Sequence, residues 1–345
     1  MHNGLLLLVL SQNGFGQTPL NDKNWDTSPI FADEFDNEQS FNNKWLKRWT
    51  WGPSNPTDLS YNHPNNVVLD LDSGILKGYA KHDPGYYEVW AWDSLGNFYT
   101  YYKYFEYTSN IIVSISAYSY GYYEIRCKLP YGEEFWPSFW NLSCSDSDPH
   151  YNEIDFFEKY PDLDDSTFTT NYHWLNTQGQ RESIKQVHKL NEISPNSSGL
   201  SKQYYIFGVE WSPKWIYFYL NNKCIRIVAN NANVPNHPQK IIAGFGVGRQ
   251  PINHINFPAV MEIDYIKVYK LKMDCSNNAQ ILNNTNLLNF DYLVKNTILV
   301  GNMNSKITIS NNASVTLRAV NSITINGEFT VSLGSEFCAM PTNCF

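Results

Sequence analysis

Short runs of β-branched and aromatic residues recur along almost the whole chain, and this recurrence restricts the possible folds most. Examples are NVVLDL, YYEIRCKL, TFTTNYHW, YYIFGVEW and WIYFYLN. Turn-forming clusters such as DLDSG, LPYGEE and LNNK separate these runs, and long stretches with helical periodicity are missing. Strands separated by turns in this way predict an all-β protein, either a sandwich or a barrel.

The amino-acid composition and pattern of the sequence change after Lys272. From there on Trp is absent and Asn is abundant, and segments such as KITIS and EFTVSLGSEF recur. They follow one another at about ten-residue steps, as small stacked β-turn units would. A chain of 345 residues has room for two domains. We therefore predict a large β domain over residues 18–272 and a small β-rich C-terminal domain over residues 273–345.

The first 17 residues resemble a secretory signal peptide. An apolar run, Leu5–Leu10, is followed by small and polar residues that end near Gly16 or Gln17. No other segment approaches the roughly 20 apolar residues that span a bilayer. We expect a secreted or cell-surface protein, in which cysteines can form disulfides. Three of the cysteines, Cys275, Cys338 and Cys344, lie in the last part of the chain, and their pairing cannot be deduced from the sequence.

The charge and the aromatic content limit the class of partner. A formal net charge of −8 argues against nucleic acid, since binding phosphate requires clustered Lys and Arg. The chain contains 11 Trp and 24 Tyr, which can fill a core or stack on sugar rings. Composition therefore allows a neutral polysaccharide as partner without requiring one, and we expect the protein to be a monomer.

One strand, YNEIDFFEKY at residues 151–160, carries three acids, Glu153, Asp155 and Glu158. In a regular strand Glu153 and Asp155 share a face, whereas Glu158 points into the opposite, apolar layer. A buried, unpaired carboxylate is costly. A β-bulge at Phe156–Phe157 would return Glu158 to the face of the other two acids, and bulges of this kind often lie beside active sites.

Two long glutamate side chains on one face, with Asp155 between them, suit a retaining glycosidase. In that chemistry one carboxylate attacks and the other donates a proton, at a separation of about 5–5.5 Å. Asp155 would help to set which glutamate is ionised. The spacing also fits two other readings, a solvated outer face and a calcium site.

The acidic strand and five other stretches resemble glycoside hydrolase family 16, the group of laminarinases, agarases and carrageenases. EIDFFE is similar to the E-x-D-x-x-E signature of that family. The other stretches occur in the same order and cover most of residues 28–272: IFADEFD, YGYYEIRCKLP, FWPSFWNL, YIFGVEWSPKWIYFYLNNK and MEIDYIKVYK.

The resemblance implies a β-jelly-roll of two antiparallel sheets with a concave substrate cleft. It implies Glu153 as the nucleophile, Glu158 as the general acid/base and Asp155 as the residue that assists both. The anomeric configuration would be retained, and the reaction would need no cofactor.

Aromatic residues near the acidic strand are candidates for the substrate-binding cleft. Alternation along FWPSFWN places Trp136 and Trp140 on one face, which fits either a cleft or a core, and their place before the acidic strand in the family favours the cleft. His173 and Trp174 on the following strand, and Asn66 by its match to a family position, are further substrate-binding candidates. Trp51 and Trp90 are weaker ones.

The resemblance also implies a structural calcium ion on the convex side. Its protein ligands here would include Glu34 of the DEF segment and Asp264 of the last strand. The alternative is that both are ordinary surface acids, because one carboxylate with backbone carbonyls makes only a moderate calcium site.

The family acts on several polysaccharides, and we expect a β-1,3-glucan of the laminarin type. The alternative is a red-algal galactan such as agar, porphyran or carrageenan. A sulfated galactan would need basic side chains at the cleft. The candidates for that role are Arg181, Lys185, Lys189 and Arg249.

Two readings from other classes remain beside the enzyme. One is a carbohydrate-binding jelly-roll without catalysis, and the other is a surface adhesin in which the C-terminal domain is the active part. The C-terminal domain resembles small β-rich modules of secreted Bacteroidetes proteins. We interpret it as an accessory or anchoring unit, whose deletion should leave catalysis on soluble substrate largely intact.

Overall fold

The structure is a computed structural model that describes residues 6–7, 25–143, 151–212, 215–229, 237–248, 257–272, 275–281, 285–287, 290–291, 294–342 and 344. The predicted signal peptide over residues 1–17 lies outside these ranges, apart from Leu6–Leu7, so it stays a prediction. Within the described ranges, every helix is too short or too polar to cross a membrane.

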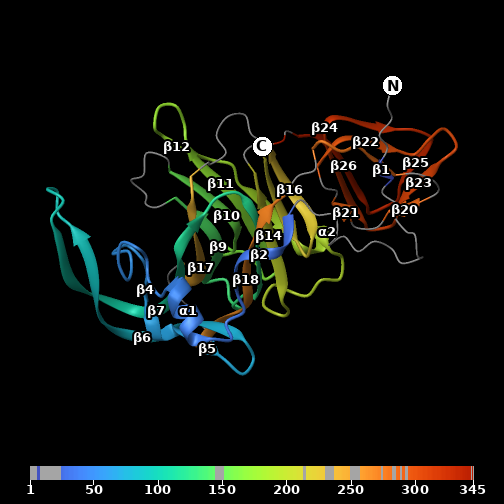
Figure 1. Cartoon of the computed structure of the whole chain (residues 1–345). Coiled ribbons are helices and arrows are strands. Elements are labelled where there is room, and N and C mark those ends of the chain that lie inside the picture. The colour runs from blue at the N-terminus through green and yellow to red at the C-terminus, as the bar shows by residue number, and fades with distance from the viewer. Residues whose placement is uncertain are drawn as a thin grey trace.

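Two antiparallel sheets pack face to face and form a β-jelly-roll, as the sequence predicts (Figure 1). We call them the inner and the outer sheet. The inner sheet contains β3 (Trp45–Leu46), β7 (Phe98–Tyr118), β17 (Gln239–Val247), β9 (Phe135–Leu142), β10 (Asn152–Glu158), β11 (Thr167–Leu175), β12 (Arg181–Ser183) and β13 (Gln186–Lys189).

The outer sheet is built around β18 (Ala259–Leu271), which pairs with strands on both of its edges. The other members are β16 (Lys223–Ala229), β15 (Trp215–Leu220), β14 (Tyr205–Trp211), β8 (Gly121–Lys128), β2 (Trp25–Asp33), β6 (Ile75–Trp92) and β5 (Val67–Asp70).

The core lies between the two sheets because their strands alternate apolar and polar residues. On β9, Phe135, Pro137 and Phe139 are buried, whereas Trp136 and Trp140 are on the other face and partly exposed. This confirms the alternation predicted for FWPSFWN. It leaves the second face of the inner sheet available for a binding cleft.

Short helices occupy connections outside the sheets. Helix α1 (Glu38–Lys44) begins at Asn37, whose side chain accepts a hydrogen bond from the Ser40 backbone N–H. Acidic Glu38 in the first turn and basic Lys44 in the last suit the helix dipole. The others are a 3₁₀ turn, η2 (Pro64–Asn66), and α2 (Leu190–Ile193).

Strands β6 and β7 form a long hairpin, which we call the arm and define as residues 85–105. Paired residues run from Gly85 and Phe105 to Trp92 and Phe98. Figure 1 shows the arm projecting from the sandwich. At its base, β4 (Ser60–Asn62) pairs in parallel with β7. A small cluster of Tyr61, Val89 and Phe105 buries one face of this base.

The pairing changes from antiparallel to parallel after β18 ends at Leu271, close to the predicted boundary at residue 273. One sheet contains β1 (Leu6–Leu7), β19 (Ala279–Ile281), β22 (Lys295–Val300), β24 (Ser314–Ile325), β26 (Glu336–Pro341) and β21 (Phe290–Asp291). The second contains β20 (Thr285–Leu287), β23 (Lys306–Ile309) and β25 (Glu328–Val331). We call this unit the C-terminal solenoid.

Each coil of the solenoid uses two of the short alternating segments. Leu287 pairs with Ile309 and Ile309 with Val331, so each partner lies 22 residues further on. The ten-residue steps of the sequence are therefore half-coils. Successive coils turn at Gly301 and Gly327, which have positive φ values of 73° and 79°. A Cβ on Gly327 would lie 2.2 Å from the Asn302 carbonyl oxygen, so this turn requires glycine.

Cys275 and Cys344 form a disulfide that ties the first residues of the solenoid to its last, with Cα atoms 6.1 Å apart. The sequence left this pairing open. Such a bridge between distant residues stabilises the fold mainly by restricting the unfolded chain.

The solenoid packs on the outer sheet, away from the inner sheet (Figure 1). Arg318 of β24 is buried and pairs with buried Glu210 of β14. Its guanidinium also donates to the Tyr219 hydroxyl at 3.0 Å and lies over the ring of Tyr217 at 4.2 Å. The two units therefore share a buried, partly aromatic interface.

Candidate active site

The acidic strand is β10, in the interior of the inner sheet, between β9 and β11. Opposite β11, Asp155 pairs with Asn171 and Glu158 with Thr169, so β10 advances three residues while β11 advances two. On the β9 side, Phe156 is the residue without a partner. This confirms the predicted bulge, and Glu153 and Glu158 face Leu142 and Ser138, four positions apart on β9.

The bulge occurs because two consecutive phenylalanines enter the core. Phe156 packs edge-on against Phe139, with ring centroids 4.7 Å apart, and Phe157 packs against Phe207 at 4.3 Å. Both side chains are almost fully buried. Burying both rings on one side returns the next residue, Glu158, to the opposite face.

Glu153 and Asp155 form a group with His173 of β11, in which Asp155 is fully buried and the other two side chains are partly exposed. The His173 Nε2 atom lies 3.1 Å from Asp155 Oδ2 and 3.8 Å from Glu153 Oε1. The Tyr151 hydroxyl donates to Glu153, and the amide of Asn171 contacts the His173 ring at 2.8 Å. Burial, and then the charge of Asp155, raise the pKa of Glu153 to about 8.

Glu158 has two donors of its own at the other end of the bulge. Trp136 Nε1 donates to Glu158 Oε1 at 3.0 Å, and the Tyr160 hydroxyl donates to Oε2 at 2.8 Å. Burial raises the pKa of Glu158, and these hydrogen bonds offset part of that rise. Asp155 is fully buried, and burial followed by the charge of Glu158 raises its pKa well above the usual value. Burial therefore raises the pKa of each of the three acids above its ordinary value, and the partners of each acid differ.

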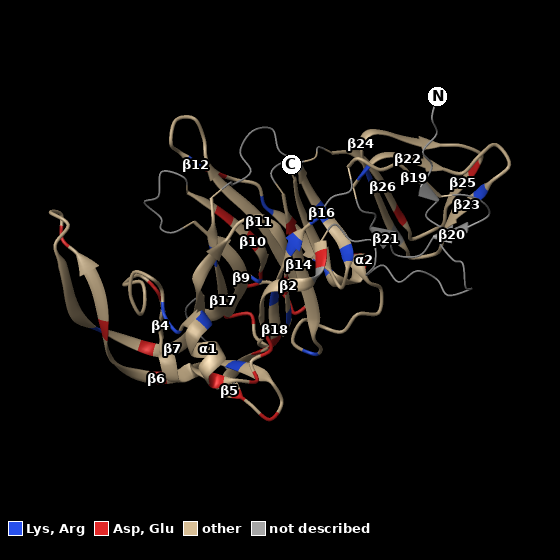
Figure 2. Cartoon of the chain, in the orientation of Figure 1, with Lys and Arg blue, Asp and Glu red and all other residues tan. Residues whose placement is uncertain are grey.

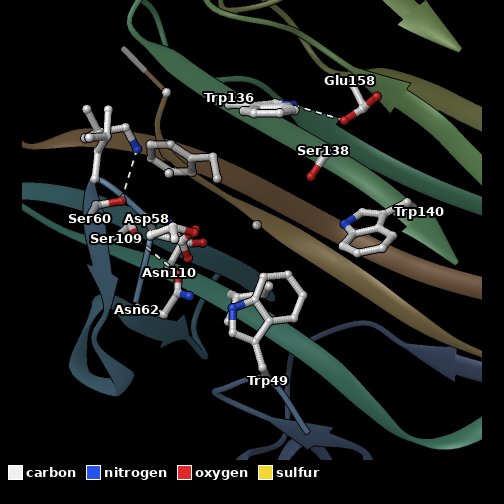
Figure 3. A pocket seen from close by; sticks show the side chains of 18 of the residues that line it. Trp49, Asp58, Ser60, Asn62, Ser109, Asn110, Trp136, Ser138, Trp140 and Glu158 are labelled. Carbon is white, nitrogen blue, oxygen red and sulfur yellow. Dashed lines mark hydrogen bonds between the residues drawn. The ribbon is translucent and has the colours of Figure 1, made fainter. Parts of the chain in front are cut away.

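A cavity of about 430 Å³ lies over these acids on the face of the inner sheet that is turned away from the core. Figure 3 shows Trp136, Ser138, Trp140 and Glu158 along one side of it, and Trp49 with a polar group at the other. That polar group, which we call the polar end, consists of Asp58, Ser60, Asn62, Ser109 and Asn110. A cavity with aromatic rings, hydroxyls and amides can hold sugar rings.

The structure brings most of the predicted site residues together. Glu153, Glu158, Trp136 and Trp140 line the cavity, and His173 contacts the acids at its floor.

Two predicted substrate-binding residues lie elsewhere. Trp174 stacks on Tyr172 with ring centroids 5.1 Å apart and packs against the core, because it points to the opposite face of β11 from His173. Asn66 is buried behind the cavity, where its amide donates to the Thr108 hydroxyl at 2.9 Å and the Ser109 carbonyl at 3.2 Å. Asn66 therefore holds β7 in place, neither residue lines this cavity, and substrate binding by the two stays a prediction.

The weaker candidates also lie outside the cavity lining. Trp51 stacks on Trp49 with ring centroids 5.1 Å apart, and Trp90 lies under the guanidinium of Arg48.

The predicted calcium ligands are engaged with basic side chains. Glu34 lies 2.7 Å from Lys267 Nζ, and Asp264 pairs with Arg126. These cations already neutralise the two carboxylates, so the donor set in this arrangement does not fit a divalent cation. A structural calcium ion here stays a prediction without support from the geometry.

A metal-ligand grouping is present among the described residues at the acids themselves. Ligand atoms of Glu153, Asp155 and His173 lie within 4.8 Å of one another. Hydrogen bonds to Tyr151 and between Asp155 and His173 already use several of these atoms.

Sequence reasoning missed Trp49 and the polar end of the cavity. Asp58 is the most notable of these residues, since burial raises its pKa to about 6. Trp49 could have been proposed from the aromatic stretch RWTW, whereas the loop and β7 residues carry no local signal. Their role follows from the parallel pairing of β4 with β7, which is a long-range contact.

Comparison with known proteins gives a consistent family and fold. The model of glycosyl hydrolases family 16 matches residues 46–267. An endo-1,3-1,4-beta-glycanase of Rhizobium meliloti is 25% identical over 257 residues, which are 72% of this chain and 52% of the relative. A keratan-sulfate endo-1,4-beta-galactosidase of Sphingobacterium multivorum is 23% identical over 268 residues, 72% of this chain and 56% of the relative. The chain thus spans about half the length of these curated relatives.

Among solved structures, the catalytic domain of an endo-1,3-beta-glucanase (laminarinase) from Thermotoga petrophila is similar in fold. The TM-score is 0.58 at 24% identity, and the match covers 72% of this chain and 99% of that domain. Residues 46–267, which the family model matches, contain the acids, the aromatic residues of β9 and most strands of both sheets.

Proposed function

Because the chain belongs to glycosyl hydrolase family 16, we propose that it is an endo-acting β-glycanase that cleaves a neutral β-glucan with retention of configuration. The observation that carries the proposal is the placement of Glu153 and Glu158 on one face of a bulged strand, where both line one cavity. Two buried carboxyls with separate hydrogen-bond partners suit separate roles in acid/base and nucleophilic catalysis.

In the first step Glu158 donates its proton to the glycosidic oxygen. A carboxylate oxygen of Glu153 bonds to the anomeric carbon as the bond to the leaving sugar breaks. In the second step Glu158, now ionised, takes a proton from water, and the water oxygen displaces Glu153 from the sugar. Two displacements at one carbon retain its configuration.

The remaining polar groups support these roles. Asp155 and His173 lie beside Glu153, where a shared proton can compensate its change of charge during the reaction. Trp136 and Tyr160 donate to Glu158 and stabilise it once it has lost its proton. Each glutamate therefore has polar neighbours of its own that can compensate its change of charge.

The charge of the cavity favours a neutral substrate. None of the described residues that line it is Lys or Arg. Arg181 and Lys185, two candidates for binding sulfate, lie over the rings of Tyr151 and Tyr160, at 4.1 and 4.8 Å. We therefore favour a β-1,3- or mixed β-1,3-1,4-glucan, in line with the names of the glucanase relatives.

The alternative is a galactan, which the similarity to a keratan-sulfate galactosidase supports. An unsulfated stretch of such a chain would also suit a cavity whose described lining contains no Lys or Arg. A carbohydrate-binding protein without turnover is the second alternative, and the presence of both glutamates argues against it.

We further propose that the protein is exported. The apolar run near its start and the Cys275–Cys344 disulfide support this, because disulfides persist mainly in oxidising compartments.

A reducing-end assay on laminarin, mixed-linked glucan, agarose, porphyran and carrageenan tests the proposal. We expect turnover of one of the two glucans and its loss, by at least about 10³-fold, in Glu153→Gln. Retained binding of glucan by Glu153→Gln, measured by affinity electrophoresis, is the control for folding. Binding without turnover by the unaltered protein would establish the non-catalytic alternative. Turnover of a galactan but of neither glucan would establish the galactanase alternative.

A further inference from the structure

The arm carries nearly all of the exposed aromatic surface of the described molecule. Apart from Tyr131 and Trp136, every exposed aromatic side chain there lies on it: Tyr86, Trp92, Phe98, Tyr99, Tyr101, Tyr102 and Tyr104. Exposed apolar surface gathered in this way usually marks a binding site. A core cannot explain it, because these side chains are exposed.

The register of the arm places three tyrosines on one face. Tyr86 lies opposite Tyr104, and Tyr102 is two residues from Tyr104 on the same strand. Their exposed fractions are 72%, 51% and 66% for Tyr86, Tyr104 and Tyr102. On the opposite face, Val89 and Phe105 are buried under Tyr61 near the base. The three tyrosines are therefore uncovered, whereas Trp90, further along the same face, lies under the Arg48 guanidinium.

The arm is held in a defined shape. At its tip, the Asp93 carboxylate accepts hydrogen bonds from the backbone N–H groups of Leu95 and Asn97, at 2.8 and 2.9 Å. Near its base, the Lys103 ammonium donates to the Pro56 carbonyl oxygen. Rings fixed in this way lose little freedom when a ligand stacks on them.

The charges of the arm limit the ligand. From Gly85 to Tyr104 its ionisable groups other than tyrosine are Glu88, Asp93 and Lys103, and Lys103 is already bound to Pro56. Figure 2 likewise shows few basic residues on the projecting hairpin. Sulfated glycans and nucleic acids need cations, so the composition suits an uncharged ligand with flat apolar faces, as sugar rings have.

The arm is continuous with the cavity. Strand β7 runs from Phe98 at the tip to Ser109, Asn110 and Ile111, which line the cavity at its polar end. A polymer that leaves the cavity at this end meets the base of the arm first.

We propose that the arm is a second carbohydrate-binding surface, on which Tyr86, Tyr102 and Tyr104 stack against sugar rings of a neutral glycan that extends beyond the catalytic cavity. This inference rests on the proposed function and deepens it. The arm gives the enzyme a preference for long chains, since short oligosaccharides fill the cavity without reaching the tyrosine face.

The test compares the full chain with a triple variant, Tyr86→Ala, Tyr102→Ala and Tyr104→Ala. We expect KM for laminarin to rise roughly five- to tenfold with kcat unchanged, because lost stacking weakens binding and leaves the acids in place. Hydrolysis of a laminari-oligosaccharide of four or five units should stay within about twofold. Equal KM values for laminarin in both proteins would overturn the proposal.

Two matched controls use the same arm. The triple variant Tyr86→Phe, Tyr102→Phe and Tyr104→Phe keeps the rings and should bind as the parent does. A variant with Tyr99→Ala and Tyr101→Ala removes rings from the other face and should bind nearly as well. If Phe and Ala variants lose binding equally, stacking is excluded.

Further measurements separate the remaining outcomes. Binding of each variant to laminarin can be measured in a Glu153→Gln background, where no turnover is needed. If the triple Ala variant binds laminarin more weakly there but the parent protein hydrolyses no substrate, the proposed function is wrong and the proposal for the arm is supported. Sedimentation shows whether the arm instead joins two copies of the chain. A dimer that dissociates in the triple Ala variant, with unchanged affinity for laminarin, would overturn the proposal.

Discussion

At the scale of single residues, the site depends on how donors are shared among three buried acids. Tyr151 donates to Glu153, His173 contacts Asp155, and Trp136 donates to Glu158. Burial raises the pKa of each carboxyl, and hydrogen bonds offset part of that rise. These donors therefore help to set the pH range in which one glutamate is ionised and the other is protonated.

Replacement of Trp136 by Phe isolates one of these hydrogen bonds. The ring remains, but the N–H that stabilises ionised Glu158 is lost, so the pKa of Glu158 should rise. Since the acid must be protonated to act, the alkaline limb of kcat/KM against pH should move up by about 0.5–1 unit. Trp140→Phe, which alters a cavity residue that donates no hydrogen bond to Glu158, is the control. An unmoved limb in Trp136→Phe would contradict the role of Glu158 as acid.

Sequence reasoning found the acids and the two tryptophans because strand alternation is local. The structure places Trp174 away from the cavity, because neighbouring His173 faces the acids and the next side chain of the strand points to the core. It also places Asn66 behind the cavity, where its partners Thr108 and Ser109 are more than 40 positions away along the chain. Contacts of this kind follow from the packed fold and have no local signature.

At the scale of elements, the bulge in β10 is the feature on which the site is built. Phe156 has no partner on β9, and the flanking pairs, Asp155 with Trp140 and Phe157 with Phe139, are regular. The bulge could be predicted because a regular strand would place the Glu158 carboxylate, without a partner, in the apolar core. The arm could not, since its length and its exposed rings resemble an ordinary hairpin in the sequence.

Deletion of single residues from β10 tests this account. Without Phe156 the strand becomes regular, and Glu158 stays opposite Ser138 on the cavity face. We expect a folded protein that keeps at least about 1% of the parent kcat and is less stable by about 3–5 kcal/mol, for the lost ring. Thermal unfolding and the reducing-end assay measure both.

Deletion of Ile154 is the matched control. It turns Glu153 towards the core while Asp155 and Glu158 stay in place, so activity should fall to background. Complete loss of activity in a folded Phe156 deletion would contradict the account, because all three acids remain on one face there.

At the scale of the whole molecule, the solenoid is packed on the catalytic unit more closely than an accessory domain on a linker would be. Arg318 and Glu210 are both almost fully buried at the interface, beside Tyr217 and Tyr219. The sequence could not predict this contact, because nothing near Glu210 or Arg318 in the sequence indicates that the two residues form a pair. The expectation that the solenoid is dispensable for turnover stays a prediction, but its removal should cost stability.

The variant Arg318→Met tests the interface. It leaves the buried Glu210 carboxylate without its cation, so we expect a loss of stability of about 3–5 kcal/mol. The double variant Arg318→Met with Glu210→Gln should regain much of that loss. Turnover of soluble glucan at low temperature should be unchanged in both, since the cavity lies on the other sheet. A melting temperature equal to that of the parent in Arg318→Met would show that the interface contributes nothing.

The account of this molecule as a retaining glycanase is tested most directly by the configuration of its first product. Proton NMR during hydrolysis of a glucan substrate, at high enzyme concentration, resolves the anomers before mutarotation mixes them. A nucleophilic Glu153 and an acid/base Glu158 predict that the β-anomer appears first and the α-anomer only later. Early appearance of the α-anomer would mean direct attack by water, and it would contradict the assignment of Glu153 as nucleophile.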